Sequence, residues 1–463
     1  MPTYRTPDVY IDEISLFPPS VAEVESAIPA FVGYTEKIKR GNNEDLKLKP
    51  TKIYSFAQFR EFFGDPPADE VTVDVKIDQS DGKSVNVQKI TLPTPKHVLA
   101  YAMKLFFDNG GGKCYVTSVG EYLKSGKLSA DALIGGLEAV AKEDEPTLLV
   151  IPEAALLDAA DYTKVMTVAF KQCGLLKDRF VIADVPTPAE NAKADDIRKP
   201  LPSSDLKYGA AYYPFLKTSL NYWIASDEKN VKVTGAEPAP PANSPTPSLA
   251  DYRDKMTSVY SAVKSELARQ YVVLPPSGAV AGVYATTDTR RGAWKAPANV
   301  GLADVIEPLV KVDNTQQDEL NVDPNSGKSV NVIRSFYGDT VIWGARTLDG
   351  NSNEWRYVNV RRFFSMVEES VKKSTHWAVF EPNDANTWVK VRGMIEAYLT
   401  QKWREGALAG ATPKDAFFVR CGLGTTMTQQ DILEGRMNVE IGMAVVRPAE
   451  FIVLKFSHKL QVS

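Results

Sequence analysis

The sequence has few residues that bind metals or form cross-links. Its three cysteines and three histidines are widely separated, and none forms a C-x-x-C pair; they are Cys114, Cys173, Cys421, His97, His376 and His458. A structural zinc site needs closely spaced Cys or His ligands, and a disulfide framework needs paired cysteines. We therefore expect no metal and no cofactor, and we predict free cysteines that pack as small hydrophobic side chains in a reducing compartment.

The chain also lacks long apolar runs and an excess of basic residues. Its N-terminus, MPTYRTPDVYIDEI, has no apolar signal core, and no uncharged run approaches the roughly 20 residues needed to span a bilayer. The 54 basic and 58 acidic side chains give a formal net charge of -4, which does not favour nucleic-acid binding. We expect synthesis as a soluble cytoplasmic protein of about three domains, with no membrane insertion.

The hexapeptide GKSVNV occurs twice, beginning at Gly82 and at Gly327, and raises the question of a phosphate-binding loop. Such a loop also needs a glycine five residues earlier, where this sequence has Ile77 and Val322. It must join a strand to a helix, whereas the residues on both sides of the first copy alternate as strands do. We predict β-hairpins with turns at Asp-Gly or Ser-Gly instead.

Other catalytic patterns are missing too. There is no G-x-S-x-G, H-E-x-x-H or C-x-x-C motif, and the adjacent Glu368 and Glu369 would point about 100° apart on a helix. Asp184 ends an apolar run, but nothing nearby completes a metal site, so we interpret it as a turn carboxylate. A Ser/His/Asp arrangement assembled in space is left open, with no positive support. We expect no enzyme activity and no catalytic residues.

What is present is a mixed α/β pattern. Apolar spacing from Thr94 predicts a helix that stops at Gly110–Gly112 before the strand CYVTSV. PTLLVIP and RFVIADVP flank a helical segment, which indicates a βαβ unit with a partly parallel sheet. Residues 249–267 carry one apolar helical stripe, and EWRYVNVRR, residues 354–362, alternates as a strand before two helices. TTMTQQDILEGR predicts a capped helix, with Thr428 and Asp431 spaced for mutual capping.

At residues 275–302, PPSGAVAGVYATTDTRRGAWKAPANVGL, the sequence closely resembles the tail sheath proteins of contractile phage tails and related injection systems. The resemblance continues through YGAAYYPFL, VNVIRSFYGDTVIWGARTL, WRYVNVRRFFSMVEESV and WAVFEPNDANTWVKVRGMIEAYLTQKWREGAL to VRPAEFIVLKFS. It covers most of the chain in one order. Two departures are Asp8, where the family usually has glycine in its N-terminal arm, and a hairpin at 65–95 that looks like an insertion.

The resemblance implies a multi-domain α/β subunit whose inner domain is formed by both chain ends. The implied parts are an N-terminal strand arm at 1–25, the first part of the inner domain at 26–120, outer inserted domains at 121–340 with a Pro-rich loop at 237–247, and a C-terminal inner domain at 341–463. The extended arms would add to sheet edges of neighbouring subunits through Val9, Tyr10, Ile11, Phe451, Val453 and Leu454. Because such exchange does not close on itself, it builds a helical polymer, here of stacked hexameric rings.

The implied function is a sheath that assembles around an inner tube in a metastable extended state and contracts to drive the tube through a target envelope. Implied partners are the tube, baseplate and tail-terminator proteins and paralogous sheath subunits, within a virion or a released phage-tail-like particle. Residues 341–463 carry 16 Lys or Arg and 13 Asp or Glu, so basic side chains there are candidates to face an acidic tube: Arg361, Arg362, Lys372, Lys373, Lys402 and Arg404. The alternatives are another structural tail subunit, or a soluble NTPase or hydrolase.

Overall fold

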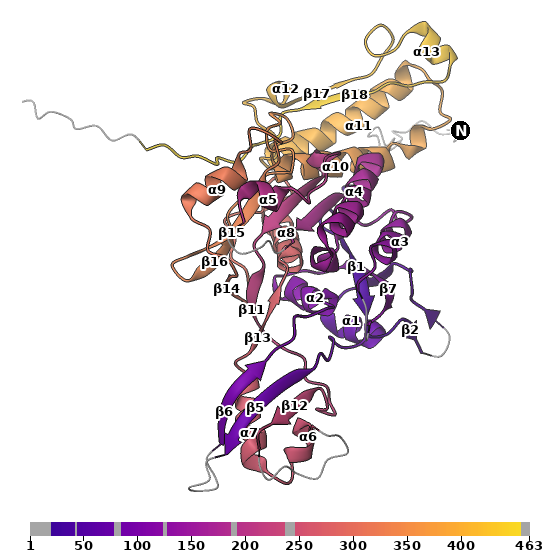
Figure 1. The fold of residues 1–463 in the computed structure, drawn as a ribbon. Coiled ribbons are helices and arrows are strands. Elements are labelled where there is room, and N and C mark those ends of the chain that lie inside the picture. The colour runs from indigo at the N-terminus through magenta and orange to yellow at the C-terminus, as the bar shows by residue number, and fades with distance from the viewer. Residues whose placement is uncertain are drawn as a thin grey trace, which may run out of the picture. The chain divides into compact units, whose positions relative to one another are not determined.

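The computed structural model describes residues 20–41, 44–77, 85–123, 127–186, 192–236 and 246–454. The chain divides into two compact units (Figure 1). The smaller unit combines Met1–Val24 with Met366–Val446, and the larger combines Glu25–Ser365 with Arg447–Ser463.

An eight-stranded sheet organises the larger unit. Its strands, in spatial order, are β16 (Asp339–Ile342), β15 (Val330–Phe336), β10 (Gly209–Tyr213), β9 (Phe180–Asp184), β8 (Leu148–Val150), β1 (Pro29–Thr35), β7 (Cys114–Glu121) and β4 (Thr51–Ile53). All neighbouring pairs from β15 to β7 are parallel, and the outermost strands β16 and β4 are antiparallel. Parallel strands buried on both faces need continuous apolar sequence, which explains why the βαβ unit was predictable.

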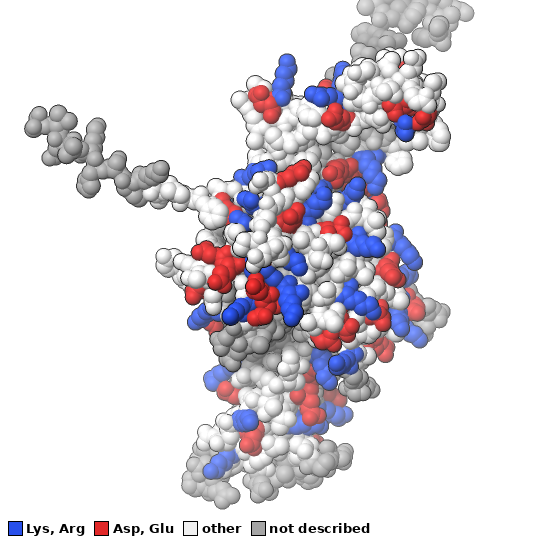
Figure 2. Space-filling model, turned by 45° about the horizontal axis from the view of Figure 1, so that its top comes forward, with Lys and Arg blue, Asp and Glu red and all other residues white. Residues whose placement is uncertain are grey.

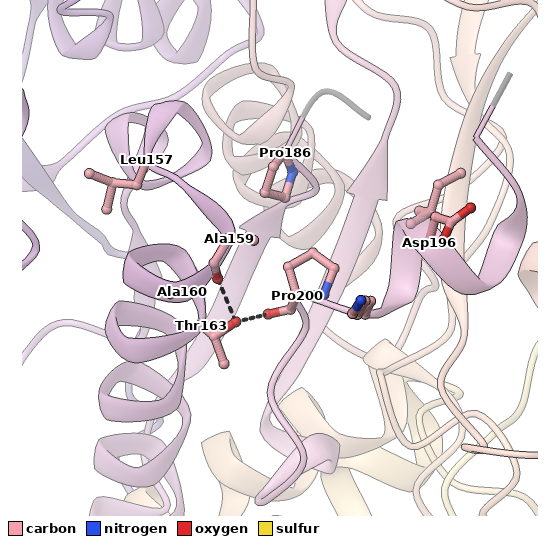
Figure 3. A pocket seen from close by; sticks show the side chains of 9 residues that line it. Leu157, Ala159, Ala160, Thr163, Pro186, Asp196 and Pro200 are labelled. Carbon is pink, nitrogen blue, oxygen red and sulfur yellow. Dashed lines mark hydrogen bonds between the residues drawn. The ribbon is translucent and has the colours of Figure 1, made fainter. Parts of the chain in front are cut away.

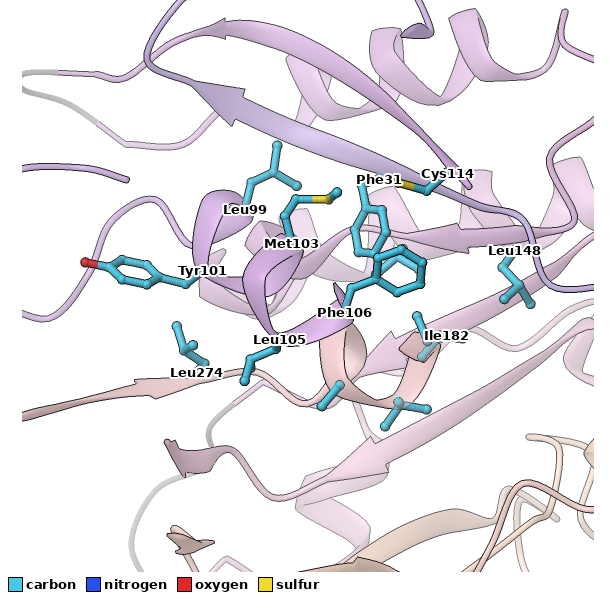
Figure 4. Packing of buried hydrophobic residues seen from close by; sticks show 14 of the residues in the cluster. Phe31, Leu99, Tyr101, Met103, Leu105, Phe106, Cys114, Leu148, Ile182 and Leu274 are labelled. Atoms are coloured by element: carbon cyan, nitrogen blue, oxygen red, sulfur yellow. The ribbon is translucent and has the colours of Figure 1, made fainter. Parts of the chain in front are cut away.

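Helices cover both faces of this sheet. Side chains alternate along each strand, so Phe31 packs into one core with α2 (Leu99–Asp108) and α8 (Ser277–Arg291), whereas Val32 packs into the other with α3 (Ala130–Val140) and α4 (Ala159–Leu176). Figure 4 shows Phe31 turned toward Phe106 of α2, with ring centroids 5.2 Å apart. The result is a three-layer α/β/α body.

Close packing of α8 on α2 depends on two glycines. A Cβ at Gly278 would lie 2.4 Å from the carbonyl oxygen of Ala102, and one at Gly282 would lie 2.6 Å from that of Phe106. These backbone atoms cannot move aside as a flexible side chain can. The small residues of SGAVAG therefore serve helix packing.

Smaller elements complete the larger unit. One three-stranded sheet contains β13 (Tyr271–Leu274), β11 (Leu216–Asn221) and β14 (Val305–Pro308); another contains β12 (Val231–Thr234), β5 (Val71–Ile77) and β6 (Val85–Thr91). The second shares a separate apolar core with α6 (Leu249–Tyr252) and α7 (Thr257–Leu267). Short elements elsewhere are β2 (Lys39–Arg40), β3 (Glu44–Asp45), α1 (Phe56–Phe63), α5 (Ala194–Arg198) and α9 (Asn314–Asn321).

The smaller unit is mostly helical. Helix α10 (Val358–Ser374) begins in the larger unit and continues into the smaller, which also holds α11 (Ala385–Arg404), α12 (Pro413–Ala416), α13 (Gln429–Leu433), β17 (Phe417–Arg420) and β18 (Glu440–Met443). The predicted capping of α13 is confirmed, because Thr428 and Asp431 form a reciprocal capping box. Figure 1 shows these elements from orange to yellow.

The last three residues of the first GKSVNV copy, Val85–Val87, begin β6, which pairs antiparallel with β5 as expected of a hairpin, and Gly82–Ser84 lie outside the described residues. The hairpin prediction is wrong for the second copy, because β15 pairs in parallel with β10 and α9 precedes it. The helix stop at Gly110 is confirmed, at φ +86.

Two other predictions are corrected. The stripe at 249–267 forms two helices, α6 and α7, because Ser248 and Asp251 form a capping box on a short first helix and the backbone at Met256 is not helical. Residues 358–362 are the start of α10 rather than a strand. A short β-propensity run was overridden by the helical spacing of buried Val360, Phe363 and Val367.

Two of the expected domain boundaries fall inside strands, at residue 120 in β7 and at residue 341 in β16. The sheet runs through the expected boundary at residue 120, because β1 pairs with both β7 and β8. The observed division on the C-terminal side falls at Ser365, inside α10, rather than at residue 341. The hairpin expected as a separate insertion shares a sheet with β12, more than 150 residues later.

Candidate assembly surfaces

Asp184, the strand-end carboxylate, caps a helix. It is the last residue of β9 and is buried, and its Oδ1 accepts a hydrogen bond of 2.6 Å from the backbone N–H of Ser277 at the start of α8. Burial raises the pKa of Asp184 to about 7, although the hydrogen bonds from Ser277 act to lower it. It is a buried cap between two elements, so the interpretation as a turn carboxylate is wrong.

The crevice where a doubly wound sheet would bind a ligand is filled by side chains. In the strand order β7-β1-β8-β9-β10, the chain goes from β1 to β7 on one side and then crosses to β8 on the other side of β1. The switch point therefore lies between β1 and β8, and doubly wound sheets bind ligands at such a point. Here the carboxylate of buried Glu153 accepts a 2.8 Å hydrogen bond from the N–H of Tyr34 and lies 3.5 Å from Nδ1 of His97. A Cβ at Gly33 would lie 2.8 Å from the same carboxylate. The switch point is occupied by the protein itself.

A pocket of about 490 Å³ lies beside the N-terminus of α4 (Figure 3). Its lining residues are Leu157, Ala159, Ala160, Thr163, Pro186, Asp196, Ile197, Lys199 and Pro200. The Thr163 hydroxyl lies 2.7 Å from the carbonyl oxygen of Ala159 and 2.8 Å from that of Pro200. The lining is largely apolar and offers no acid–base pair held in hydrogen-bond contact.

The described part of the chain holds no group of three or more His, Cys, Asp or Glu side chains arranged to bind a metal ion. Within the same residues, no helix combines the length and the apolar character needed to cross a membrane.

The C-terminal segment exposes four consecutive apolar side chains. Phe451, Ile452, Val453 and Leu454 have exposed fractions of 72%, 78%, 77% and 72%, and this stretch of chain forms no strand. Three of the predicted arm residues, Phe451, Val453 and Leu454, lie here; the other three, Val9, Tyr10 and Ile11, lie outside the described residues. A continuous exposed apolar run of this kind marks a site of interaction with a partner.

The smaller unit contains an incomplete sheet. Strands β17 and β18 pair antiparallel from Phe417↔Met443 to Arg420↔Glu440, and among the described residues this sheet has only these two strands. Phe418 remains 41% exposed. A two-stranded ribbon is marginally stable by itself, so its outer edges are available to a strand from another chain.

Three of the six basic side chains proposed to face a tube are buried. The side chain of Arg362 is 3% exposed and pairs with Asp288 of α8, while its Nη2 donates to the Ser26 carbonyl at 2.9 Å. Arg361 lies over the rings of Trp355 and Tyr208, at 4.4 and 5.2 Å from their centroids. Both arginines stabilise the larger unit from inside, so they are removed from the candidates.

Lys402 is also buried, with a side chain 6% exposed that pairs with Glu23 and Glu405. Lys372 has a side chain 65% exposed, Lys373 is 38% exposed, and Arg404 is exposed as well. Tube contact stays a prediction for these three. Figure 2 shows basic and acidic residues interspersed over the visible face, without a large patch of one sign.

The helix at residues 358–362 could have been predicted from the helical spacing of its apolar residues. Had residues 358–374 been analysed with a period of 3.6, Arg362 would have shared a face with Val358 and Met366, both buried. The acidic partner Asp288 lies 74 residues earlier and could not be identified from spacing.

Comparison with known proteins gives consistent similarities. A family model described as the phage tail sheath C-terminal domain matches residues 351–459. Two curated tail sheath proteins are similar: that of Enterobacteria phage T4, 26% identical over 163 residues, and that of Vibrio phage KVP40, 28% identical over 131 residues. These matches cover 33% and 27% of this chain but only 24% and 19% of the relatives' own length.

Solved structures match almost the whole chain. The anti-feeding prophage helical sheath in its contracted state is 30% identical, with a TM-score of 0.65, and the match covers 99% of this chain and 100% of that one. The sheath complex of the extracellular contractile injection system PVC, also contracted, is 29% identical with a TM-score of 0.67 and 99% coverage of both chains. A chain of the anti-feeding prophage baseplate structure is 31% identical with a TM-score of 0.66, over 99% of this chain and 100% of that one.

Proposed function

The chain belongs to the tail sheath proteins of contractile injection systems, and from this we propose that it polymerises helically around an inner tube and contracts to drive that tube through a target envelope. The mixed α/β fold matches contracted sheath structures over nearly the full chain. A sheath subunit is a structural protein, and the filled switch point fits that role. The proposed setting is a phage tail or an injection particle, assembled after synthesis in the bacterial cytoplasm.

The exposed apolar run at Phe451–Leu454 is the observation that carries the proposal. An exposed apolar run of this kind marks an interaction site, and a two-stranded ribbon such as β17–β18 is stabilised by a further strand. Donation of this segment to the ribbon of a neighbouring subunit would satisfy both through main-chain hydrogen bonds. Because donor and acceptor are different surfaces, each subunit donates to the next and a helical polymer results.

Contraction is proposed as repacking of subunits that stay connected by these arms. The baseplate is a proposed partner because a similar chain occurs in the anti-feeding prophage baseplate structure. Lys372, Lys373 and Arg404 remain the candidates for contact with an acidic tube, where polar contacts would allow release. Energy would be stored in the extended lattice, whose bistable interfaces need no nucleotide.

The test is electron microscopy of the protein co-expressed with its neighbouring tube and baseplate genes, before and after acid or denaturant shock. We expect straight rods that shorten and widen and expose a bare inner tube. Soluble monomers under every condition, or rods of one fixed length, would overturn the proposal.

A truncated protein tests whether the C-terminal arm is needed for assembly but not for folding of the subunit. Removal of residues 451–463 should abolish rods while leaving a folded subunit, as measured by circular dichroism and by gel filtration at monomer size. The matched control replaces Leu433, an apolar side chain 79% exposed on α13, with Ser. That variant should still form rods.

A further inference from the structure

Glu450 lies immediately before the exposed C-terminal run, and its carboxylate accepts four hydrogen bonds. Nε and Nη2 of buried Arg346 donate to its two carboxylate oxygens at 2.9 and 2.7 Å. Asn321 Nδ2 donates at 2.9 Å and the Tyr357 hydroxyl at 3.1 Å. A bidentate guanidinium–carboxylate pair fixes orientation as well as position.

Exposure to solvent rises sharply between Glu450, which is held by hydrogen bonds, and the next residue, Phe451. The Glu450 side chain is 21% exposed, whereas Phe451 is 72% exposed. All four donors to Glu450 belong to the larger unit, although the chain up to Val446 belongs to the smaller. The C-terminal run therefore leaves the protein from the larger unit.

The N-terminal end has a counterpart in the smaller unit. Glu23 pairs with Nζ of buried Lys402 and accepts a hydrogen bond of 3.1 Å from the Tyr398 hydroxyl. On either side of Glu23, the backbone N–H of Ala22 donates to the Ser374 hydroxyl and that of Val24 donates to the Ser370 hydroxyl, both at 3.0 Å. Each end of the chain thus carries a glutamate held by one buried cation and one tyrosine hydroxyl.

We propose that Glu450 and Glu23 are positioning residues that anchor the two arms, one on each unit, and deliver the load carried by each arm to the body of the subunit. The inference rests on the proposed function, because it assumes that the arms connect subunits. The free C-terminal arm then starts at residue 451 rather than at the unit boundary after Val446. When subunits repack, each arm follows the unit that holds its glutamate.

The first measurement uses the full-length monomer, so it does not depend on sheath assembly. A nitroxide is attached to Ala449→Cys, just inside the anchor, or to Ile452→Cys, just outside it; both positions are exposed and the three native cysteines are buried. In the parent protein we expect an immobile label at 449 and a mobile one at 452. Glu450→Gln should make the label at 449 as mobile as the label at 452, whose mobility is unchanged.

Two further variants guard the interpretation. Glu450→Asp keeps the charge but shortens the reach, so it should give intermediate mobility at 449, and it replaces Glu450→Gln if that variant does not fold. Glu307→Gln is the matched control, because the Glu307 side chain in β14 is 40% exposed, lies 3.5 Å from a similarly exposed Lys217 and is outside the β17–β18 ribbon. An immobile label at 449 in both Glu450 variants would overturn the anchor.

The second measurement uses assembled rods. Glu450→Gln and Glu23→Gln should each form rods that break into fragments on contraction, while Glu307→Gln rods contract whole. Intact contraction of either anchor variant would show that the glutamate does not transfer the arm's load to the body. Absence of rods from the parent protein would instead refute the proposed function and leave the label experiment valid.

Discussion

Replacing Arg362 should destabilise the larger unit rather than weaken binding to a tube. Nη1 of Arg362 donates to Oδ1 of Asp288 at 3.1 Å, Nη2 contacts Oδ2, and Ser26 Oγ donates to the same Oδ2 at 2.6 Å. The side chains of Arg362 and Asp288 are 3% and 6% exposed. Arg362→Met therefore leaves a buried carboxylate with only a hydroxyl partner.

The expected loss follows from this burial. Removing one partner of a buried ion pair costs about 3–5 kcal/mol. With an unfolding entropy of about 2.1 cal/mol/K per residue and a unit of roughly 350 residues, that loss lowers the melting temperature by about 4–7 °C. Asp288→Leu added to Arg362→Met should recover part of the loss, because a buried pair replaced by apolar side chains is often neutral.

Differential scanning calorimetry of the monomer measures this directly. Lys372→Met is the control on the same helix: its side chain is 65% exposed, its partner Glu369 keeps Lys373, and an exposed pair contributes about 0–1 kcal/mol. A melting temperature for Arg362→Met as close to the parent as that of Lys372→Met would refute the buried pair. It would also return Arg362 to the tube-facing candidates.

Three other outcomes are expected. Gly282→Ala should destabilise the larger unit by about 1–3 kcal/mol in denaturant melts because its Cβ would meet the Phe106 carbonyl, whereas Gly393→Ala in α11, with open space around it, should be neutral or stabilising. Asp184→Asn should flatten the pH dependence of stability between about pH 4 and 7: burial raises the folded pKa above the unfolded one, so the parent loses stability as pH rises through that window. The three buried thiols should react with a thiol reagent only after unfolding, since burial raises the pKa of each; fast labelling of native protein would contradict their burial.

Local patterns predicted local structure well. The apolar runs that became β8 and β9, the helix ended by Gly110 and the capped helix after Thr428 all have their determinants within a few residues. These elements are specified by burial of both sheet faces, by a glycine at positive φ and by side-chain capping, none of which needs a distant partner.

Features that depend on contacts between residues distant in the sequence could not be predicted. Arg362 depends on Asp288 and Ser26, so its sequence neighbourhood suggested a solvated basic site where the fold makes a core contact. The expected boundary at residue 120 cuts the central sheet for the same reason, because β1 pairs with β8 across more than 100 residues. Glu450 gave no signal, since its donors come from three separate segments of the chain.

The filled switch point and the anchored arms fit one mechanical requirement. A doubly wound sheet that binds a ligand keeps its crevice open, but here Glu153 and His97 occupy it and close contact at Gly33 leaves no space for a guest. An arm that carries load to Glu450 displaces the whole sheath only if the body behind Arg346 does not deform. When this crevice is filled and both faces of the sheet are covered by close-packed layers, the subunit transmits such a load with little internal movement. Opening the crevice by Glu153→Ala should therefore soften the larger unit, measured as faster hydrogen exchange at Tyr34, whose N–H loses its acceptor, while the label at Ala449 stays immobile. Equal exchange at Tyr34 in both proteins would show that Glu153 does not hold this edge of the sheet.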